Sequence, residues 1–296
     1  MRETNTEIEW FKNSSLYIIV QVMNFVLIDG SYYIFYRYYA LCVWYKLRKK
    51  PEDPDIPFES EMFMEKFRDT FVSKIAEMDS MLGIDQSVKY VGKDCPKHTI
   101  WRNAHIENYK GGRGGDDVSS LFKVAYSEEL FAKADCKGVL EYPALEADDC
   151  IALAAQHIRQ KYPEAKVWII TSDMDYLQIA RDPWITLVDL KYKNLTTSKT
   201  SFQDAKKDLF CKIVAGDKSD NIPSVLPRCG IKTAAKYYEN RDLFERKLKE
   251  CDGAAERLER NTTIVDFACI PEELKTGFNA IVADTIVADA IVADLL

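Results

Sequence analysis

The stretch that decides the fold is LEADDC at 145–150, which is followed by TSDMD at 171–175. The first group opens a segment with helical periodicity, and the second ends an apolar run typical of a buried strand. Carboxylates held about 4 Å apart near a protein surface repel by roughly 4 kcal/mol unless cations compensate them. Helix capping explains one or two acids in a first turn, but three in four positions exceed what a cap needs. The two groups therefore predict a divalent-metal site.

The composition is that of an ordinary globular protein, with 296 residues, 47% apolar and 29% charged. The net charge of -7 argues at first against a phosphate-bearing partner, but bound cations would reverse the charge of an acidic site. Eight cysteines show neither CxxC spacing nor a histidine cluster, which disfavours zinc and indicates a reduced intracellular compartment. The apolar run at 16–20 is too short for a membrane span, so we expect no membrane partner. Met23 lies immediately before the first predicted strand, so we expect residues 1–22 to be an N-terminal extension.

Apolar runs alternate with segments of helical periodicity along most of the chain. This alternation predicts an α/β fold with a mainly parallel central sheet flanked by helices. Strands are predicted at 24–28, 87–92, 139–142, 166–171 and 184–190, and helices at 31–50, 59–82, 116–134, 146–160 and 201–214. A hairpin-like stretch after 190 and an extended stretch at 262–270 are also expected. The tail repeats IVAD with a period of five, which fits neither helix nor strand, and we assign it no function.

Two single aspartates follow predicted strands, and two more occupy a later turn. Asp29 and Asp94 come directly after the first and second strands, where open parallel sheets bind ligands. Alone, Asp29 is more readily explained as a helix cap. Asp217 and Asp220 fit metal coordination and a structural turn about equally well.

Basic residues occur in two places that suit phosphate. YKGGRGG at 109–115 is a flexible, cationic segment that alone is typical of a surface loop. Later, a tight connection leads into a helix that begins KTAAK at 232–236. Backbone N–H groups at such a helix start, with lysines beside them, can hold a DNA phosphate.

Taken in order, these motifs resemble the flap endonuclease or 5′-3′ exonuclease family, which includes phage and viral 5′-nucleases and the 5′-nuclease domain of polymerase I. The matching residues span roughly 23–236 and include EADD at 146–149, SDMD at 172–175 and GDKSDNIP at 216–223. The resemblance implies a PIN-like nuclease core at 23–205 with a helical arch at about 110–138. It also implies a helical DNA-binding segment, a helix–turns–helix, at 206–270, followed by a C-terminal tail at 271–296.

The resemblance also implies a structure-selective 5′-nuclease that hydrolyses DNA by a two-metal mechanism in replication or repair. Two Mg²⁺ ions, for which Mn²⁺ can substitute, would be held by Asp29, Asp94, Glu146, Asp148, Asp149, Asp173, Asp175, Asp217 and Asp220. Lys110 and Arg113 would be catalytic. The implied DNA contacts are Arg102, Gly230, Lys232, Thr233 and Lys236, with a K⁺ ion at the helix–turns–helix. The expected substrate is DNA with a 5′ single-stranded flap or end, or an RNA–DNA hybrid, and the expected state is a monomer that works with an unspecified replication protein.

Two other functions remain open at the level of the sequence. A PIN-type endoribonuclease would share the acidic α/β site but would not need the helical module after Asp220. A non-catalytic nucleic-acid-binding replication protein would be expected to lack some of the acids, and none is missing. One departure from the family pattern is the hairpin IPSVLPRCGIKTA at 222–234, which carries one inserted residue and has Arg228 where relatives have glycine.

Overall fold

The structure is a computed structural model that describes residues 23–112 and 118–293, with side chains of the last helix described as far as Ile286. The predicted extension at 1–22 and Arg113 lie outside the described residues. Within the described part of the chain, no helix combines the length and the apolar character that a bilayer crossing requires.

A five-stranded, fully parallel sheet forms the centre of the molecule, which confirms the predicted fold class. The strands are β1 (Asn24–Asp29), β2 (Val88–Gly92), β3 (Cys136–Leu140), β4 (Lys166–Ile170) and β5 (Ile185–Val188), in the order β3-β2-β1-β4-β5. The central strand β1 pairs Asp29 with Gly92 of β2, and Ile28 with Ile170 of β4. The carboxyl ends of these three strands therefore lie level at one edge of the sheet.

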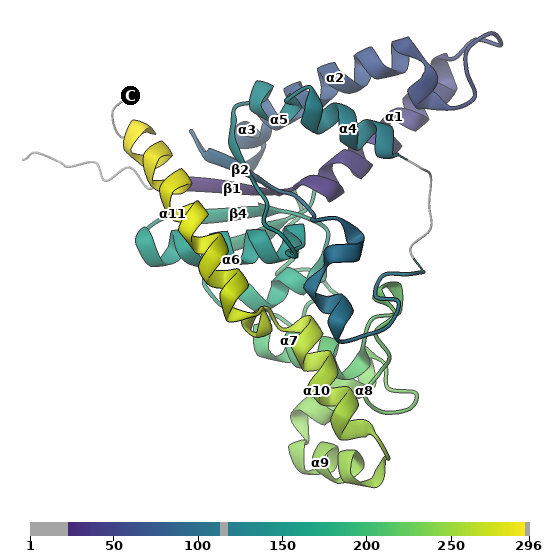
Figure 1. The fold of residues 1–296 in the computed structure, drawn as a ribbon, viewed down its shortest axis with the longest axis vertical. Helices are drawn as coiled ribbons and strands as arrows, with labels where there is room; N and C mark the ends of the chain where they lie inside the picture. The colour runs from purple at the N-terminus through teal and green to yellow at the C-terminus, as the bar shows by residue number, and fades with distance from the viewer. Residues whose placement is uncertain (1–22, 113–117, 294–296) are drawn as a thin grey trace, which may run out of the picture.

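Helices cover both faces of the sheet (Figure 1). The elements on one face are α1 (Gly30–Arg48), α2 (Glu61–Ala76), α3 (Met78–Leu82), α4 (Ser119–Ser127) and α5 (Leu130–Lys133). On the other face are α6 (Ala147–Lys161) and the long C-terminal helix α11 (Glu272–Ala293). Two apolar cores result, one on each side, and the strands contribute side chains to both because successive residues point to opposite faces.

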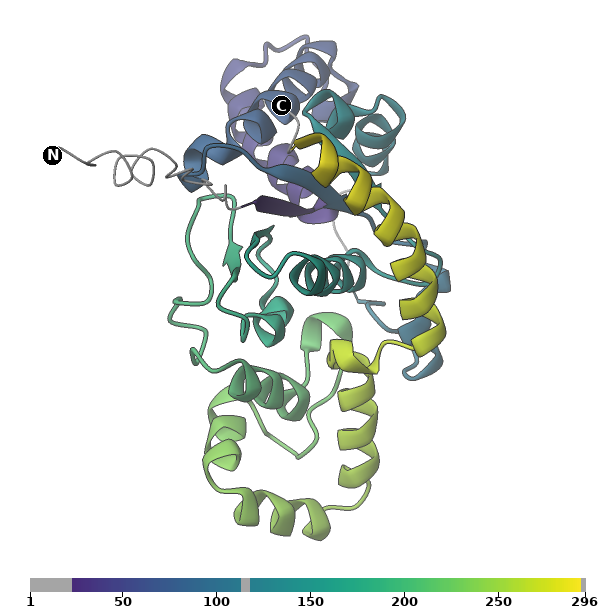
Figure 2. The same ribbon diagram turned by 90° about the vertical axis from the view of Figure 1, so that its left-hand side faces the viewer.

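The remaining helices form a separate group below the sheet, as Figure 2 shows. They are α7 (Ala205–Ala215), α8 (Ile231–Glu239), α9 (Arg241–Glu250) and α10 (Ala254–Val265). This group, here called the helical segment, has its own small core. Asn261 of α10 is fully buried and donates from Nδ2 to the carbonyls of Ile213 (3.0 Å) and Pro223 (2.8 Å), which fixes α10 against α7 and the turn that follows it.

Several predicted boundaries are wrong. The third strand lies at Cys136–Leu140 rather than 139–142, and the hairpin-like stretch is reduced to an isolated bridge between Val188 and Asn194. The stretch at 262–270 is not extended: α10 runs to Val265, and a 3-10 turn follows at Phe267–Cys269. The IVAD tail forms most of α11. A five-residue period places only some apolar positions on one helix face, but burial of Phe278, Val282 and Ile286 is enough to hold the helix on the core.

Two glycines allow the close approach that brings the strand ends and α6 together. A Cβ on Gly92 would lie 2.7 Å from the Ile151 side chain and 2.9 Å from the carbonyl of Ala147. A Cβ on Gly30 would lie 2.6 Å from the carbonyl of Gly92. Because real Cβ contacts are not this short, any larger residue would push β1, β2 and α6 apart at the sheet edge.

We predict that Phe278→Ala lowers the free energy of unfolding by about 3–5 kcal/mol, the usual cost of emptying a buried phenylalanine site. Phe278 is 1% exposed and its ring lies 6.4 Å from that of Tyr142, so α11 depends on it for docking. Urea denaturation would measure the change. Ile281→Ala, on the same helix at 54% exposure, is the matched control and should cost much less; equal losses for the two variants would contradict the assigned packing.

Candidate active site

The predicted acids collect at the carboxyl edge of the sheet, where loops and helix starts meet. Asp29 ends β1, Asp94 follows β2, and Asp173 follows β4. Glu146, Asp148 and Asp149 stand at the start of α6, and Asp217 and Asp220 come from the turn after α7. The edge is thus built from the core and from the helical segment together.

Asp29 is both a helix cap and a member of the acidic edge. Its Oδ1 accepts a hydrogen bond from the backbone N–H of Tyr32 (3.0 Å), and its Oδ2 accepts one from the Thr171 hydroxyl (3.3 Å). Burial, and after it the charge of Asp94, raises the pKa of Asp29 to about 7. The capping explanation is therefore correct but incomplete, because the same carboxyl is desolvated against other acids.

Asp94 ties the second strand to α6. Its Oδ1 accepts from the backbone N–H of Ala147 (2.9 Å), and its Oδ2 accepts from the Ser31 hydroxyl. A carboxylate beside the first N–H groups of a helix is favoured by the helix dipole. Asp94 is exposed, so this acid lies where the edge meets solvent.

The start of α6 holds the tightest acidic group. Glu146, Asp148 and Asp149 each offer a carboxylate oxygen, and these atoms lie within 4.8 Å of one another. Glu146 and Asp149 also form a capping box, in which the backbone N–H of Glu146 donates to Asp149 Oδ2 at 3.2 Å. Capping explains why α6 begins here, but Asp148 takes no part in that box.

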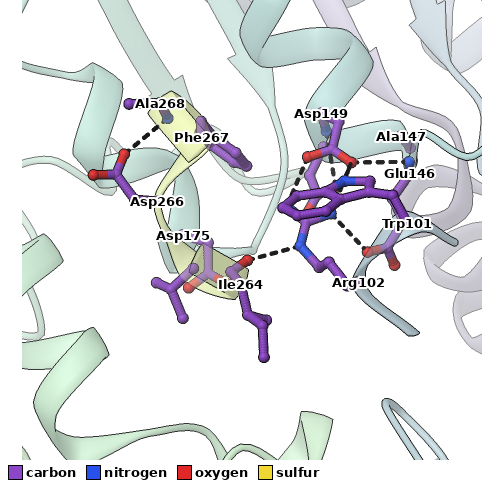
Figure 3. A network of polar contacts seen from close by, with 12 residues as sticks. Trp101, Arg102, Glu146, Ala147, Asp149, Asp175, Ile264, Asp266, Phe267 and Ala268 are labelled. Atoms are coloured by element: carbon purple, nitrogen blue, oxygen red, sulfur yellow. Dashed lines mark hydrogen bonds and ion pairs between the residues drawn. The ribbon is translucent and has the colours of Figure 1, made fainter. Parts of the chain in front are cut away.

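A buried arginine neutralises part of this group (Figure 3). Arg102 is 2% exposed; its two terminal nitrogens lie 2.7 and 2.6 Å from the oxygens of Asp149, and Nη1 also lies 2.9 Å from Glu146. Its Nε donates to the carbonyl of Ile264 at 2.7 Å, and Trp101 donates to Asp149 at 3.0 Å. The DNA contact predicted for Arg102 is wrong, because the guanidinium is enclosed and donates to Asp149, Glu146 and the Ile264 carbonyl instead.

Lys110 lies beside Glu146, and its side chain is 14% exposed, compared with 3% for Glu146. Its Nζ is 2.5 Å from Glu146 Oε1, and its backbone N–H donates to the carbonyl of Asp220 at 3.1 Å. Its φ is 52°, a left-handed conformation that is uncommon for a residue other than glycine and costs of order 1–3 kcal/mol. Burial and Asp148 raise the pKa of Glu146 to about 7, with Lys110 and Arg102 acting against the rise.

The second acidic group consists of Asp173, Asp175 and Asp217. Asp175 is almost enclosed, and burial followed by the charge of Asp173 raises its pKa to about 7. Lys212 of α7 reaches into this group: its Nζ lies 2.6 Å from Asp175 and 2.5 Å from Asp217. Burial works against ionisation of Asp217, yet the hydrogen bonds from Lys212 and Ser219 lower its pKa to about 2.

Asp148 joins the two groups electrostatically. Its charge raises the pKa values of Asp29, Glu146, Asp173 and Asp175, although these side chains come from three different strand and helix ends. The predicted acids are therefore close enough to form one shared site.

Asp217 and Asp220 are held by a tight turn that docks on the core. Asp217 and Ile222 exchange backbone hydrogen bonds of 2.8 Å in both directions, and Gly216 has a φ of 69° with no room for a Cβ. The Asn221 side chain donates to the carbonyl of Asn108 at 2.8 Å. The turn is thus structural, and it also delivers both carboxylates to the edge.

The predicted DNA contacts of the helical segment lie along α8, from its N-cap to its last turn. Gly230 is its N-cap residue, and Lys232 and Lys236 are exposed while Thr233 is partly buried. Arg228, which stands where relatives have glycine, has a φ of 57°. The backbone therefore keeps the left-handed turn that glycine would favour, although the side chain differs.

Sequence reasoning included Lys110 but missed Lys212 and the internal role of Arg102. Lys212 lies in an apolar helical stretch, five residues before Asp217, and Trp101 precedes Arg102 without a motif of its own. The excess of carboxylates in the sequence indicated that positive charge must compensate them, but it did not identify the residues that provide this charge.

The donor set fits divalent metal ions. All the candidate ligands are carboxylates, the class that suits Mg²⁺ and Mn²⁺ rather than softer metals. Burial, followed by the charge of a neighbouring acid, raises the pKa values of Asp29, Glu146 and Asp175, so a bound cation would favour the ionised forms of these groups. An α/β sheet with such an edge defines a metal-dependent hydrolase of phosphate esters as the class of protein.

Comparisons with known proteins agree with that class. Residues 24–210 match the family model described as the 5′-3′ exonuclease, N-terminal resolvase-like domain. The chain therefore belongs to the 5′-3′ exonuclease family. It is 27% identical over 213 residues to a 5′-3′ exonuclease of Buchnera aphidicola, covering 71% of this chain and 68% of that protein. It is 26% identical to ribonuclease H of phage T4 over 201 residues, covering 61% of this chain and 65% of the phage protein.

Two further comparisons concern part of a longer protein and the fold. DNA polymerase I of Bacillus caldotenax is 32% identical over 163 residues, which cover 52% of this chain but 18% of the polymerase. A mutant 5′-exonuclease of phage T5 superposes with a TM-score of 0.61 at 17% identity, covering 89% of this chain and 99% of that one. A T5 flap endonuclease solved with DNA and metal ions gives a TM-score of 0.60 at 17% identity, covering 88% and 98%.

We predict that protein stripped of metal with a chelator loses stability as the pH rises from about 4 to about 7. The raised pKa values of Asp29, Glu146 and Asp175 mean that the folded state favours their protonated forms, so ionisation costs stability above the unfolded pKa. Thermal unfolding should show a lower Tm at about pH 8 than at about pH 5 in chelator, and added Mg²⁺ should raise the Tm more at the higher pH. Asp175→Asn should reduce this pH dependence, and a Tm that rises with pH in chelator would contradict the charge balance described here.

Proposed function

We propose that this protein is a structure-selective 5′-nuclease that hydrolyses DNA phosphodiester bonds where a duplex meets a 5′ single strand. The observation that carries the proposal is the single acidic edge, to which three strand ends, the start of α6 and the turn after α7 contribute. Lys110 lies at this edge, against Glu146. Family membership supplies the reaction class, and the T5 relative solved with DNA supports DNA as the substrate.

The proposed ligands of two Mg²⁺ ions, or of Mn²⁺ in their place, fall into two sets. Asp29, Asp94, Glu146 and Asp148 form one set, and Asp173, Asp175 and Asp217 form the other, with Asp220 beside Lys110. Bound divalent cations would activate water and neutralise the charge that develops on the phosphate. Asp149 is better placed to hold Arg102 than to bind metal, because both of its oxygens already accept from the guanidinium. Arg102 and Asp149 together would then orient Glu146.

Lys110 is proposed to contact the scissile phosphate. Its left-handed backbone and its hydrogen bond to the Asp220 carbonyl fix where the ammonium points, and Glu146 holds it at the edge. An ammonium positioned in advance stabilises negative charge in the transition state without reorganisation. Arg113, three residues further on, is proposed to share this role from the arch.

The helical segment is proposed to bind the duplex. Backbone N–H groups at the start of α8, with exposed Lys232 beside them, suit a DNA phosphate, and exposed Lys236 in the last turn of α8 would add a second cationic contact. A K⁺ ion at the helix–turns–helix is part of this proposal, and it would supply positive charge that favours a DNA phosphate there. An RNA–DNA hybrid is a second proposed substrate, since a relative that matches 61% of this chain is named ribonuclease H. We propose that the protein acts as a monomer.

Asp175→Asn should reduce Mg²⁺-dependent cleavage by more than about a hundredfold, since even outer-shell changes at metal sites cost ~10–100-fold. A panel of 5′-flap, 3′-flap, nicked and RNA–DNA substrates would measure the rates. The parent should cut the 5′-flap most rapidly. Asp85→Asn is the control, because Asp85 is exposed and precedes β2 at the opposite edge of the sheet; cleavage by Asp175→Asn at the rate of this control would reject the site.

Lys110→Ala should slow the single-turnover rate on the preferred substrate by a factor on the order of 10²–10³, because a preorganised charge near the reacting phosphate is lost. Substrate affinity, measured in Ca²⁺, should change far less. Lys166→Ala, at the opposite sheet edge, should leave both quantities unchanged. A Lys110 variant whose only defect is weaker binding would show that the residue acts in the ground state rather than in the chemical step.

A further inference from the structure

Lys212 forms ion pairs with one acid of the core and one acid of the turn after α7. It lies in the last turn of α7, and its backbone carbonyl accepts the N–H of Gly216 that ends the helix. From there its Nζ reaches both Asp175, in the 3-10 turn Met174–Ile179 after β4, and Asp217, in the turn after α7.

The ion pairs of Lys212 are partly buried, unlike an ordinary surface ion pair. The side chains of Lys212, Asp175 and Asp217 are 22%, 16% and 21% exposed, so solvent screens the pair of contacts only in part. The backbone around Lys212 is held in place. The helix α7 packs against the turn Met174–Ile179, and Asn261 donates a hydrogen bond to the Ile213 carbonyl near the end of α7. Removing one partner of such a pair leaves the others uncompensated.

We propose that Lys212 is a positioning residue that serves as the internal counter-ion of the second acidic group. It holds Asp175 and Asp217 together across the boundary between the core and the helical segment, and it sets how tightly a divalent cation binds there. This inference rests on the proposed function, because it assumes that these carboxylates are metal ligands.

The physical argument is one of competition. A divalent cation that binds the oxygens of Asp175 and Asp217 must replace contacts that the Lys212 ammonium already makes with both carboxylates. Lys212 therefore weakens cation binding at the second acidic group. The same ammonium reduces the repulsion between the carboxylates of Asp175 and Asp217 when no cation is bound, and it helps to hold the helical segment on the core.

The contrast with Lys207 makes the test specific. Lys207 lies on the same helix and also forms an ion pair of 2.5 Å, with Glu239, but Glu239 is 66% exposed and belongs to the helical segment itself. Lys207→Met removes the same charge from α7 without touching the acidic edge, so it is the matched control for Lys212→Met.

Calcium binding to the full chain, measured by titration calorimetry without DNA, tests the proposal. Lys212→Met should bind the weaker of two Ca²⁺ ions roughly tenfold more tightly than the parent, since the competing charge is gone. The same variant should have a lower Tm in chelator, and the deficit should disappear at saturating Ca²⁺. Lys212→Arg, which keeps the charge, should stay close to the parent in both measurements, and Lys207→Met should leave Ca²⁺ affinity unchanged.

The contradicting outcomes separate the two proposals. Unchanged or weaker Ca²⁺ affinity in Lys212→Met, with a parent that binds Ca²⁺ and cleaves DNA in Mg²⁺, would overturn the role of Lys212 alone. A tighter affinity in Lys207→Met of equal size would also overturn it, since the effect would then be one of net charge. A parent that binds no divalent cation would overturn both the counter-ion role and the proposed function.

Discussion

Repulsion between carboxylates is the constraint on which this structure depends. Parallel strands bring their carboxyl ends to one edge, so acids that are far apart in the sequence become neighbours as soon as the sheet forms. Burial makes the repulsion stronger, because the dielectric is lower there and each charge loses water. Cations of the protein itself reduce this repulsion: Arg102 contacts Asp149, Glu146 and the Ile264 carbonyl, and Lys110 and Lys212 each contact two partners at the edge.

These cations also determine how the parts of the molecule are joined. Arg102 links the start of α6 to the end of α10 through Asp149 and the Ile264 carbonyl. Lys110 links Glu146 to the turn at Asp220, and Lys212 links that same turn to Asp175. Breaking a buried ion pair costs ~3–5 kcal/mol because a charge is left without a partner. The helical segment is therefore fixed to the core by the same electrostatics that assemble the site.

Much of this arrangement could be predicted from the sequence, and what was missed has physical causes. Apolar runs ended by aspartates were sufficient to predict a parallel sheet with acids at one edge, because strand direction fixes where Asp29 and Asp94 lie. The partner of each acid could not be predicted, since long-range pairs such as Arg102 with Asp149 leave no periodic signal. Arg102 was therefore expected on the DNA surface, whereas it is buried. The helix α11 was missed because its docking depends on three buried side chains and not on a complete apolar face.

The two acidic groups differ in which parts of the chain provide their carboxylates, and this difference affects how each group can bind a cation. The carboxylates of the group at α6 all come from one helix start, and their cation Arg102 is enclosed at 2% exposure. The second group needs Asp217, which is delivered by a turn of the helical segment. Any movement of that segment must therefore change the distance between Asp217 and Asp175, and with it the affinity of the second group for a cation. The same segment carries exposed Lys232 in the first turn of α8 and exposed Lys236 in its last turn, so a partner that displaced α8 would also act on the position of Asp217.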